Sequence, residues 1–165
     1  MIAEPTEVYP EAVLEATIIE AIREILSGSN RQYLLVRHFG LDVAIFVESA
    51  AGVVVRLVET KAFHAQRPGG VGFGTARGEG PQVELLGCAE GSLALLRPAV
   101  RWVLADATLP YGTARYAWFD SETAQAAAMG GVEKGKQNNL RISALRPCYR
   151  EWPVLLSDLT AFLLE

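Results

Sequence analysis

The segment that most constrains the fold of this 165-residue chain is 40–63, where two apolar runs flank a turn of small residues. The runs, 42–47 and 53–58, are rich in β-branched residues, and 49–52 contains Ser, Ala and Gly. This pattern predicts an antiparallel β-hairpin. Both faces of the hairpin are mostly apolar, so we expect helices to cover both sides of the sheet that contains it.

The turn also fixes a register. If it is centred between Ala50 and Ala51, the numbers of facing residues add up to 101, and Asp42 faces Glu59. Side chains alternate along a strand, so Lys61 shares a face with Glu59 and therefore with Asp42. The apolar pairs on this face are Ala44 with Leu57 and Phe46 with Val55.

The hairpin therefore ends in charges. Facing side chains lie about 5 Å apart at Cβ, where two carboxylates repel each other and their pKa values rise unless a cation lies between them. Mg²⁺ suits oxygen ligands at such a separation. The alternative is that Glu59 and Lys61 form an ordinary ion pair at the end of a strand. Three observations favour a functional role: the chain has only three lysines, this is its only E-x-K, and the motif ends an apolar run.

These residues resemble the PD-(D/E)xK nuclease superfamily, whose members share a restriction-endonuclease-like core. The family motif is an acid on one strand followed by (D/E)-x-K on the next. Asp42 matches the first acid and Glu59-Thr60-Lys61 matches the second part, whereas Leu41 stands where the family has its proline. The expected order of helix, strand, hairpin and helix covers about the first two-thirds of the chain.

The resemblance implies an α/β fold with an α-β-β-β-α-β core and a mixed central sheet. It also implies hydrolysis of DNA phosphodiester bonds with Mg²⁺ or Mn²⁺ as cofactor. Asp42 and Glu59 would bind the metal, the Thr60 carbonyl would assist, and Lys61 would orient or deprotonate the attacking water. Many relatives act as dimers, so a homodimer is possible. The alternatives are a non-catalytic nucleic-acid-binding or structural module on the same fold, and an unrelated α/β protein.

A helix is predicted from Pro10 to the Ser-Gly-Ser-Asn segment at 27–30, with one apolar stripe. Glu11 lies within that stripe and Glu15 at its margin. Many members of the family place a further acid on this helix near the metal, so both are candidate ligands, Glu11 first. The alternative is a favourable interaction of these acids with the helix dipole.

Two loops are candidates for contact with nucleic acid. Residues 64–80 contain six glycines, and we expect glycine amides together with Arg67 and Arg77 to approach a phosphate backbone. Residues 130–141 carry side chains that donate to phosphates and base edges. These are Lys134, Lys136, Gln137, Asn138, Asn139 and Arg141. For both loops the alternative is an ordinary solvated surface.

The remaining elements follow from periodicity and from breaks at proline and glycine. A crossover helix is predicted from Pro81 to before Pro98, and Asp120 is expected to cap a helix that reaches Met129. A helical continuation is the alternative for the strand at 100–105. The predicted strands are 32–38, 100–105, 115–119 and 140–145, and the last helix is 153–164.

Composition sets the wider limits. At 165 residues and half hydrophobic, the chain is expected to form one domain, 1–165, with a full core. The net charge of −4 argues against tight nonspecific binding of nucleic acid, although 31–80 and 131–165 are net positive. Two distant cysteines fit a reducing cytoplasm. We expect no signal peptide, because the N-terminal region is acidic, and no membrane span, because no apolar run is long enough.

Overall fold

The computed structural model describes residues 2–165 except 39, 67–68, 76 and 88–91. The strands are β1 (Tyr33–Arg37), β2 (Val43–Ser49), β3 (Gly52–Phe63), β4 (Gly70–Phe73), β5 (Val100–Asp106), β6 (Tyr116–Asp120), β7 (Asn138–Arg141) and β8 (Tyr149–Arg150). The α-helices are α1 (Glu11–Gly28), α2 (Pro81–Gly87), α3 (Ser121–Ala127), α4 (Ile142–Leu145) and α5 (Trp152–Leu164), and two 3₁₀ helices are η1 (Ser92–Ala99) and η2 (Arg146–Cys148).

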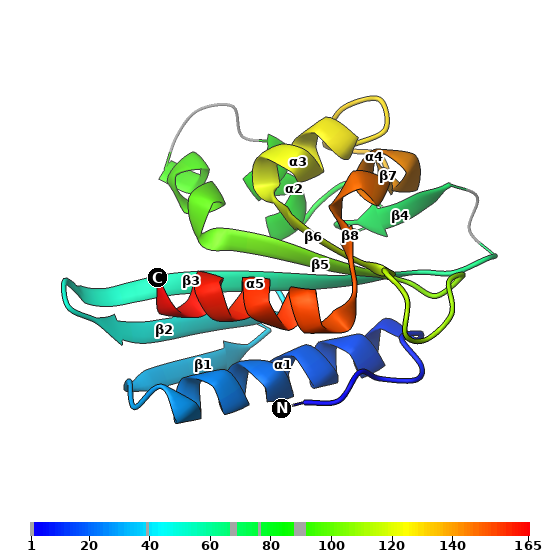
Figure 1. The fold of residues 1–165 in the computed structure, drawn as a ribbon. Coiled ribbons are helices and arrows are strands. Elements are labelled where there is room, and N and C mark those ends of the chain that lie inside the picture. The colour runs from blue at the N-terminus through cyan, green and yellow to red at the C-terminus, as the bar shows by residue number, and fades with distance from the viewer. Residues whose placement is uncertain (1, 39, 67–68, 76, 88–91) are drawn as a thin grey trace.

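Six strands form a mixed central sheet in the order β1-β2-β3-β5-β6-β8 (Figure 1). Strands β1, β2 and β3 are antiparallel neighbours, β3 and β5 are parallel, and β5, β6 and β8 are again antiparallel. The prediction of an α/β protein with a mixed central sheet is confirmed. A parallel pair requires a crossover connection, which here includes α2 and η1.

The predicted hairpin register is confirmed. Val43 pairs with Val58 and Ser49 with Gly52, so facing numbers add up to 101 along the whole of β2. Both faces are buried as expected. Helices α1 and α5 pack on the face with Val43, Ile45 and Val58, while residues of α2, α3 and α4 pack on the face with Ala44 and Leu57 (Figure 1). The hairpin therefore lies between two hydrophobic cores, one on each of its faces.

The structure corrects the sequence-based description of the segments 64–80 and 130–145. Residues 64–80 contain strand β4, which pairs antiparallel with β7 in a second, two-stranded sheet. The strand predicted at 140–145 was wrong, because β7 is already finished at Arg141 and the next four residues form helix α4. Ile142 and Leu145 are three residues apart and both buried, which is the spacing of one face of a helical turn.

Of the helix predicted between Pro81 and Pro98, the structure describes α2 up to Gly87 and a 3₁₀ helix, η1, from Ser92. Helix α3 is capped as predicted: the backbone N–H of Thr123 donates to the Asp120 carboxylate at 2.8 Å. None of the described helices is long and apolar enough to cross a membrane.

The glycine-rich and polar loops pack directly on each other. Gly78 has a φ of +70°, and a Cβ at this position would lie 2.3 Å from the backbone oxygen of Lys136. Only glycine allows so close an approach of two backbones at this φ. The two segments that were predicted as separate loops therefore form one unit, made of the β4–β7 ribbon and the loops next to it.

The segment that precedes α1 is held by a buried arginine. Arg115 donates to the Glu4 carboxylate at 3.1 Å and to the Pro5 carbonyl at 2.7 Å, and its side chain is almost fully buried. The Tyr116 hydroxyl donates to Glu4 at 2.9 Å. We call Glu4, Arg115 and Tyr116 the N-terminal clamp.

Candidate active site

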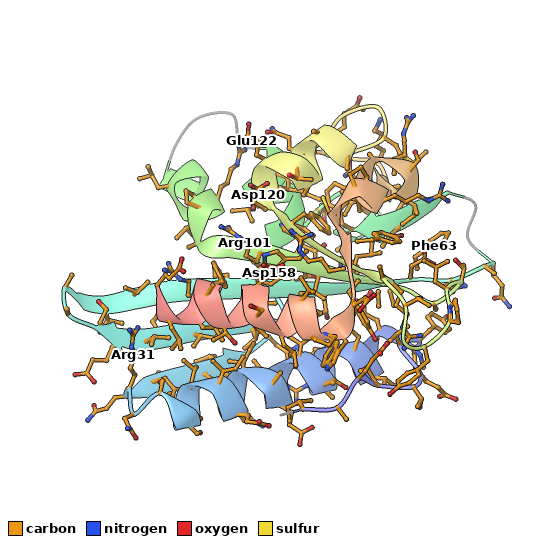
Figure 2. The ribbon with its side chains drawn as sticks, in the orientation of Figure 1. Arg31, Phe63, Arg101, Asp120, Glu122 and Asp158 are labelled. Atoms are coloured by element: carbon orange, nitrogen blue, oxygen red, sulfur yellow. The ribbon has the colours of Figure 1, made fainter. Side chains whose placement is uncertain are left out.

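The charged end of the hairpin lies inside the molecule. Asp42 immediately precedes β2, and Glu59, Thr60 and Lys61 lie near the end of β3, which finishes at Phe63 away from the hairpin turn (Figure 2). Glu59 is 1% exposed and Lys61 6% exposed. Charged side chains are rarely buried so completely without partners. Their hydrogen bonds therefore determine what this cluster can do.

Glu59 accepts hydrogen bonds from three groups. The Lys61 ammonium donates to Oε1 at 2.7 Å, the Gln82 side-chain amide donates to the same oxygen, and the Asp42 backbone N–H donates to Oε2 at 3.0 Å. The last contact joins the two strands at the predicted facing pair. Glu59 is thus held by its own strand, by the neighbouring strand and by helix α2.

Asp42 reaches the motif through its middle residue. Both the backbone N–H and the hydroxyl of Thr60 donate to Asp42 Oδ2, at 2.8 and 2.5 Å. The sequence had assigned only the Thr60 carbonyl a role, whereas the structure shows that its N–H and hydroxyl position the acid. Within the described part of the chain, hydrogen bonds reach only Oδ2 of Asp42, so Oδ1 keeps its acceptor capacity.

Of the two helix acids, Glu11 approaches the cluster. Its Oε2 accepts from the Ala62 backbone N–H at 3.1 Å, and its Oε1 lies 3.9 Å from the Lys61 ammonium. Glu15 instead forms an ion pair with Arg37 of β1 at 3.0 Å. The structure therefore brings Glu11, Asp42, Glu59 and Lys61 together and directs Glu15 to the edge of the sheet.

The cluster holds three acids around one ammonium. Burial raises the pKa of Glu59 to about 7, even though Lys61 nearby lowers it. Burial also raises the pKa of Glu11. For Lys61, burial alone would lower the pKa, but the combined effect of Glu59, Glu11 and Asp42 raises it, so the side chain stays an ammonium. A buried acid that titrates near neutrality beside other acids is a feature of functional sites.

The acids fit a hard divalent cation in their chemistry. Carboxylate oxygens are the ligands that Mg²⁺ and Mn²⁺ prefer, and each oxygen has two acceptor sites, so Glu59 Oε2 and Asp42 Oδ1 can both take another partner. In the described part of the chain, no three His, Cys, Asp or Glu side chains are already grouped to hold a metal. Mg²⁺ is commonly bound by only one or two carboxylates, with waters and substrate phosphates completing its shell.

Gln82 is a site residue that the sequence did not single out as a ligand or catalyst. Its side-chain nitrogen donates to Glu59, and its side-chain oxygen accepts from the Gly74 backbone N–H at 3.0 Å. Pro81 begins α2 and so places Gln82 in the first turn of that helix. The available signals were its place after a helix-starting proline and the polar residue that many members of the resembled family have on this helix, with an ordinary polar residue at a helix start as the favoured alternative. Gln82 connects the acids to the loop that follows β4.

The residues predicted to contact nucleic acid are placed unequally. Arg67 lies outside the described residues, while Arg77, Gln137 and Arg141 are exposed. Lys134 pairs with Glu84 at 2.7 Å and Lys136 with Glu133 at 3.2 Å, so both cations lie beside acids on the surface. Asn139 is partly buried within β7.

Asn138 differs from its neighbours in the same segment. It is 1% exposed, and its side-chain amide donates to the Glu133 and Lys136 carbonyls and accepts from the Glu133 backbone N–H. All of these bonds lie within the loop 133–138. Its predicted contact with a nucleic acid does not fit this position, because the side chain holds the loop in shape.

No protein-family model, curated protein or solved structure matches this chain. The interpretation of the site therefore depends on its own geometry and chemistry.

Proposed function

We propose that this protein is a metal-dependent endonuclease that hydrolyses DNA phosphodiester bonds. The observation that carries the proposal is the buried cluster at the end of the hairpin, where Glu59 has a pKa of about 7 and faces Asp42, with Lys61 and Glu11 beside them. The order α1, β1, β2, β3, α2, β5, with β5 parallel to β3, supports it as well. Apart from the inserted β4, this order agrees with the α-β-β-β-α-β order that the resemblance implies.

Asp42 and Glu59 are the metal ligands in this proposal, and Glu11 is the third acid within reach of the cluster. A bound Mg²⁺ or Mn²⁺ supplies charge neutralisation at the phosphate and lowers the pKa of a water. The chain itself fixes the ligands, because Thr60 holds Asp42 and the Asp42 backbone holds Glu59. Glu15 has no part in the proposed centre, since it pairs with Arg37.

Lys61 acts as a hydrogen-bond donor in this mechanism. Its pKa is raised by three nearby carboxylates, so it remains protonated and is poorly suited to remove a proton from water. An ammonium at this position can orient the attacking water or donate to an oxygen of the scissile phosphate. Of the two roles that the motif suggests for Lys61, orientation is therefore the one we retain.

We assign binding of the substrate backbone to the unit made of the β4–β7 ribbon and its neighbouring loops, which pack closely at Gly78. Arg77, Lys136 and Arg141 are exposed cations on the two loops of this unit, and the glycine amides between them can approach phosphates. The chain as a whole is acidic, so its affinity for DNA should be moderate and strongly dependent on salt.

The test is single-turnover cleavage of DNA with enzyme in excess, in Mg²⁺, Mn²⁺ or EDTA, for wild type, Lys61→Ala and Glu59→Gln. Both variants should lose most of the cleavage rate, roughly a factor of 10² or more, because Glu59→Gln removes a metal ligand and Lys61→Ala removes the donor to the water or the phosphate. Glu48→Gln is the matched control, since Glu48 is an exposed acid of the same hairpin. Cleavage by Lys61→Ala at the wild-type rate would contradict the proposal.

A non-catalytic binding module is the second candidate, and one contact favours it. Lys61 already neutralises Glu59 at 2.7 Å, as an ion pair with a purely structural role would. Thermal unfolding with and without millimolar metal separates the two, because a ligand that binds the folded state raises Tm. The nuclease should gain Tm from Mg²⁺ or Mn²⁺ and Asp42→Asn should gain less. DNA binding with neither a gain in Tm nor turnover would identify a binding module.

A further inference from the structure

An apolar cavity of about 510 Å³ lies next to the candidate active site. This volume is within the range of roughly 300–1,000 Å³ that is usual for ligand sites. Its wall is made by Leu41, Leu57, Leu85, Leu96 and Pro81, with Gly40 beneath and Glu84 as the charged member. We call it the leucine cavity.

The cavity and the candidate active site share the same stretches of chain. Leu41 directly precedes Asp42, Pro81 directly precedes Gln82, and Leu57 lies two residues before Glu59 on the same face of β3. Two residues along a strand span about 7 Å, a distance that a sugar and its base can bridge. The sugar and base next to a phosphate held at the acids are therefore within reach of this cavity.

The wall of the cavity is already formed. Gly40 has a φ of +81°, and a Cβ there would lie 3.2 Å from Cγ of Pro81, so the backbone before Asp42 packs closely on the start of α2. Leu41, Leu57 and Leu85 are each less than a tenth exposed, whereas Leu96 at the rim is 39% exposed. Of these four leucines, Leu96 is therefore the one that a ligand approaching from solvent can contact.

One charged group gives the cavity a chemical preference. Glu84 is the charged residue among those that line it, and its carboxylate forms an ion pair with Lys134 at 2.7 Å. A carboxylate can accept from the exocyclic amine of a base, as Glu and Asp do with cytosine N4. Lys134 belongs to the polar loop 130–141, so the cation that pairs with Glu84 can also approach a phosphate.

From these observations we propose that the leucine cavity binds one unpaired, amino-bearing nucleobase of a single-stranded segment, next to the phosphate held at Asp42 and Glu59. The inference deepens the proposed function and rests on it for the position of that phosphate. A base within a duplex is stacked and paired, so it cannot reach a cavity beside the phosphate unless it is extruded. The cavity therefore selects single-stranded or distorted DNA as the substrate.

The test measures binding in EDTA, where no cleavage is needed. Fluorescently labelled single strands of dC, of dT and of the same length without bases are titrated with wild type, Leu96→Phe and Leu96→Glu. Wild type should bind the dC strand roughly tenfold more tightly than the baseless strand and more tightly than dT. Leu96→Phe fills part of the cavity and Leu96→Glu places a negative charge on its apolar lining, so both should reduce this preference to nearly nothing.

Leu95→Phe is the matched control, because Leu95 is the adjacent residue of η1, is 80% exposed and does not line the cavity. It should keep the wild-type preference. Thermal unfolding shows whether each variant is folded. If Leu96→Phe does not fold, Leu96→Glu is the second variant that tests the same position.

Equal affinity of wild type for base-bearing and baseless strands overturns the inference. So does a change of oligomeric state in Leu96→Phe with unchanged DNA affinity, which would make the cavity a contact between protein chains. These outcomes are independent of turnover. If the protein cleaves DNA but shows no base preference, the nuclease proposal stands and the cavity proposal fails. If only the Leu96 variants lose a base preference and no cleavage occurs in metal, the cavity proposal is supported and the nuclease proposal is contradicted.

Discussion

Two clusters of buried charge, the N-terminal clamp around Arg115 and the acids around Lys61, differ in the number of carboxylates that surround the cation. Arg115 has one acid, Glu4, and its remaining hydrogen bonds include the Pro5 carbonyl. Lys61 has three, and burial raises the pKa values of Glu59 and Glu11. The clamp has the charge balance of a structural element, whereas the excess of acid around Lys61 is a free-energy cost that a bound cation would relieve.

The largest effect on stability is expected from Arg115→Met. This change leaves Glu4 buried without its guanidinium and removes the bond to Pro5, and breaking one side of a buried pair costs about 3–5 kcal/mol. Urea denaturation gives the free energy of unfolding, with Arg146→Met as control for an exposed arginine. A loss below about 1 kcal/mol would show that the clamp is not structural.

The second prediction concerns the pH dependence that Glu59 imparts. Its pKa is raised from 4.5 to about 7 in the folded state, so the folded protein binds more protons than the unfolded chain within that window. Stability from this group is fully present below pH 4.5 and falls as pH rises to 7, by roughly 3 kcal/mol in total. In EDTA, the unfolding free energy of wild type minus that of Glu59→Gln should therefore decrease as the pH rises from 4.5 to 7. A difference that is constant across the window would refute the assignment.

A smaller change is expected when both charges of the site pair are removed together. Glu59→Gln with Lys61→Met removes both members of the closest buried pair, so neither of them is left unpaired, and such replacements are often neutral or stabilising. We expect stability within about 1 kcal/mol of wild type or above it, without cleavage. The two single variants complete a double-mutant cycle, in which strictly additive effects would argue against a direct Glu59–Lys61 interaction.

The smallest effect on folding is expected for the exposed cations of the segment 130–141. Lys136 pairs with Glu133 on the surface, and exposed pairs contribute about 0–1 kcal/mol. Replacing Lys136 and Arg141 by Ala should leave Tm nearly unchanged but flatten the salt dependence of DNA binding by about one unit of slope per lost phosphate contact. Arg23→Ala on α1 is the control for an exposed cation elsewhere. An unchanged slope would remove these residues from the proposed DNA contact.

The hairpin and the charges at its end could be predicted from the sequence because their determinants are local. Alternating apolar residues and a short turn fix the register, and the register alone places Asp42 opposite Glu59. The sequence shows only repulsion between the two acids, which suggests that removing either would leave folding intact or improved. The hydrogen bonds reverse that expectation, since Asp42 accepts from Thr60, and Glu59 accepts from Asp42, Lys61 and Gln82.

The remainder depends on contacts between distant segments. Strand β4 has only four residues within a glycine-rich stretch, and its partner β7 follows more than sixty residues later. Gln82 is separated from Glu59 by the whole β4 region, so no local spacing reveals their contact. Asn138 resembles its polar neighbours in sequence, and only its burial distinguishes it. Such features need tertiary structure, because local pattern carries no information about them.

The parallel pairing of β3 with β5 also has a kinetic consequence. Glu59 aligns with Trp102 and Lys61 with Leu104, so more than forty residues must be looped out before β5 covers this end of β3. Non-local pairings of this kind cost loop-closure entropy before their contacts can form, so they tend to form late in folding. Until then water can solvate the carboxylates, so the cost of burying them falls after the main barrier. Raising the pH towards 7 should therefore accelerate unfolding far more than it slows folding.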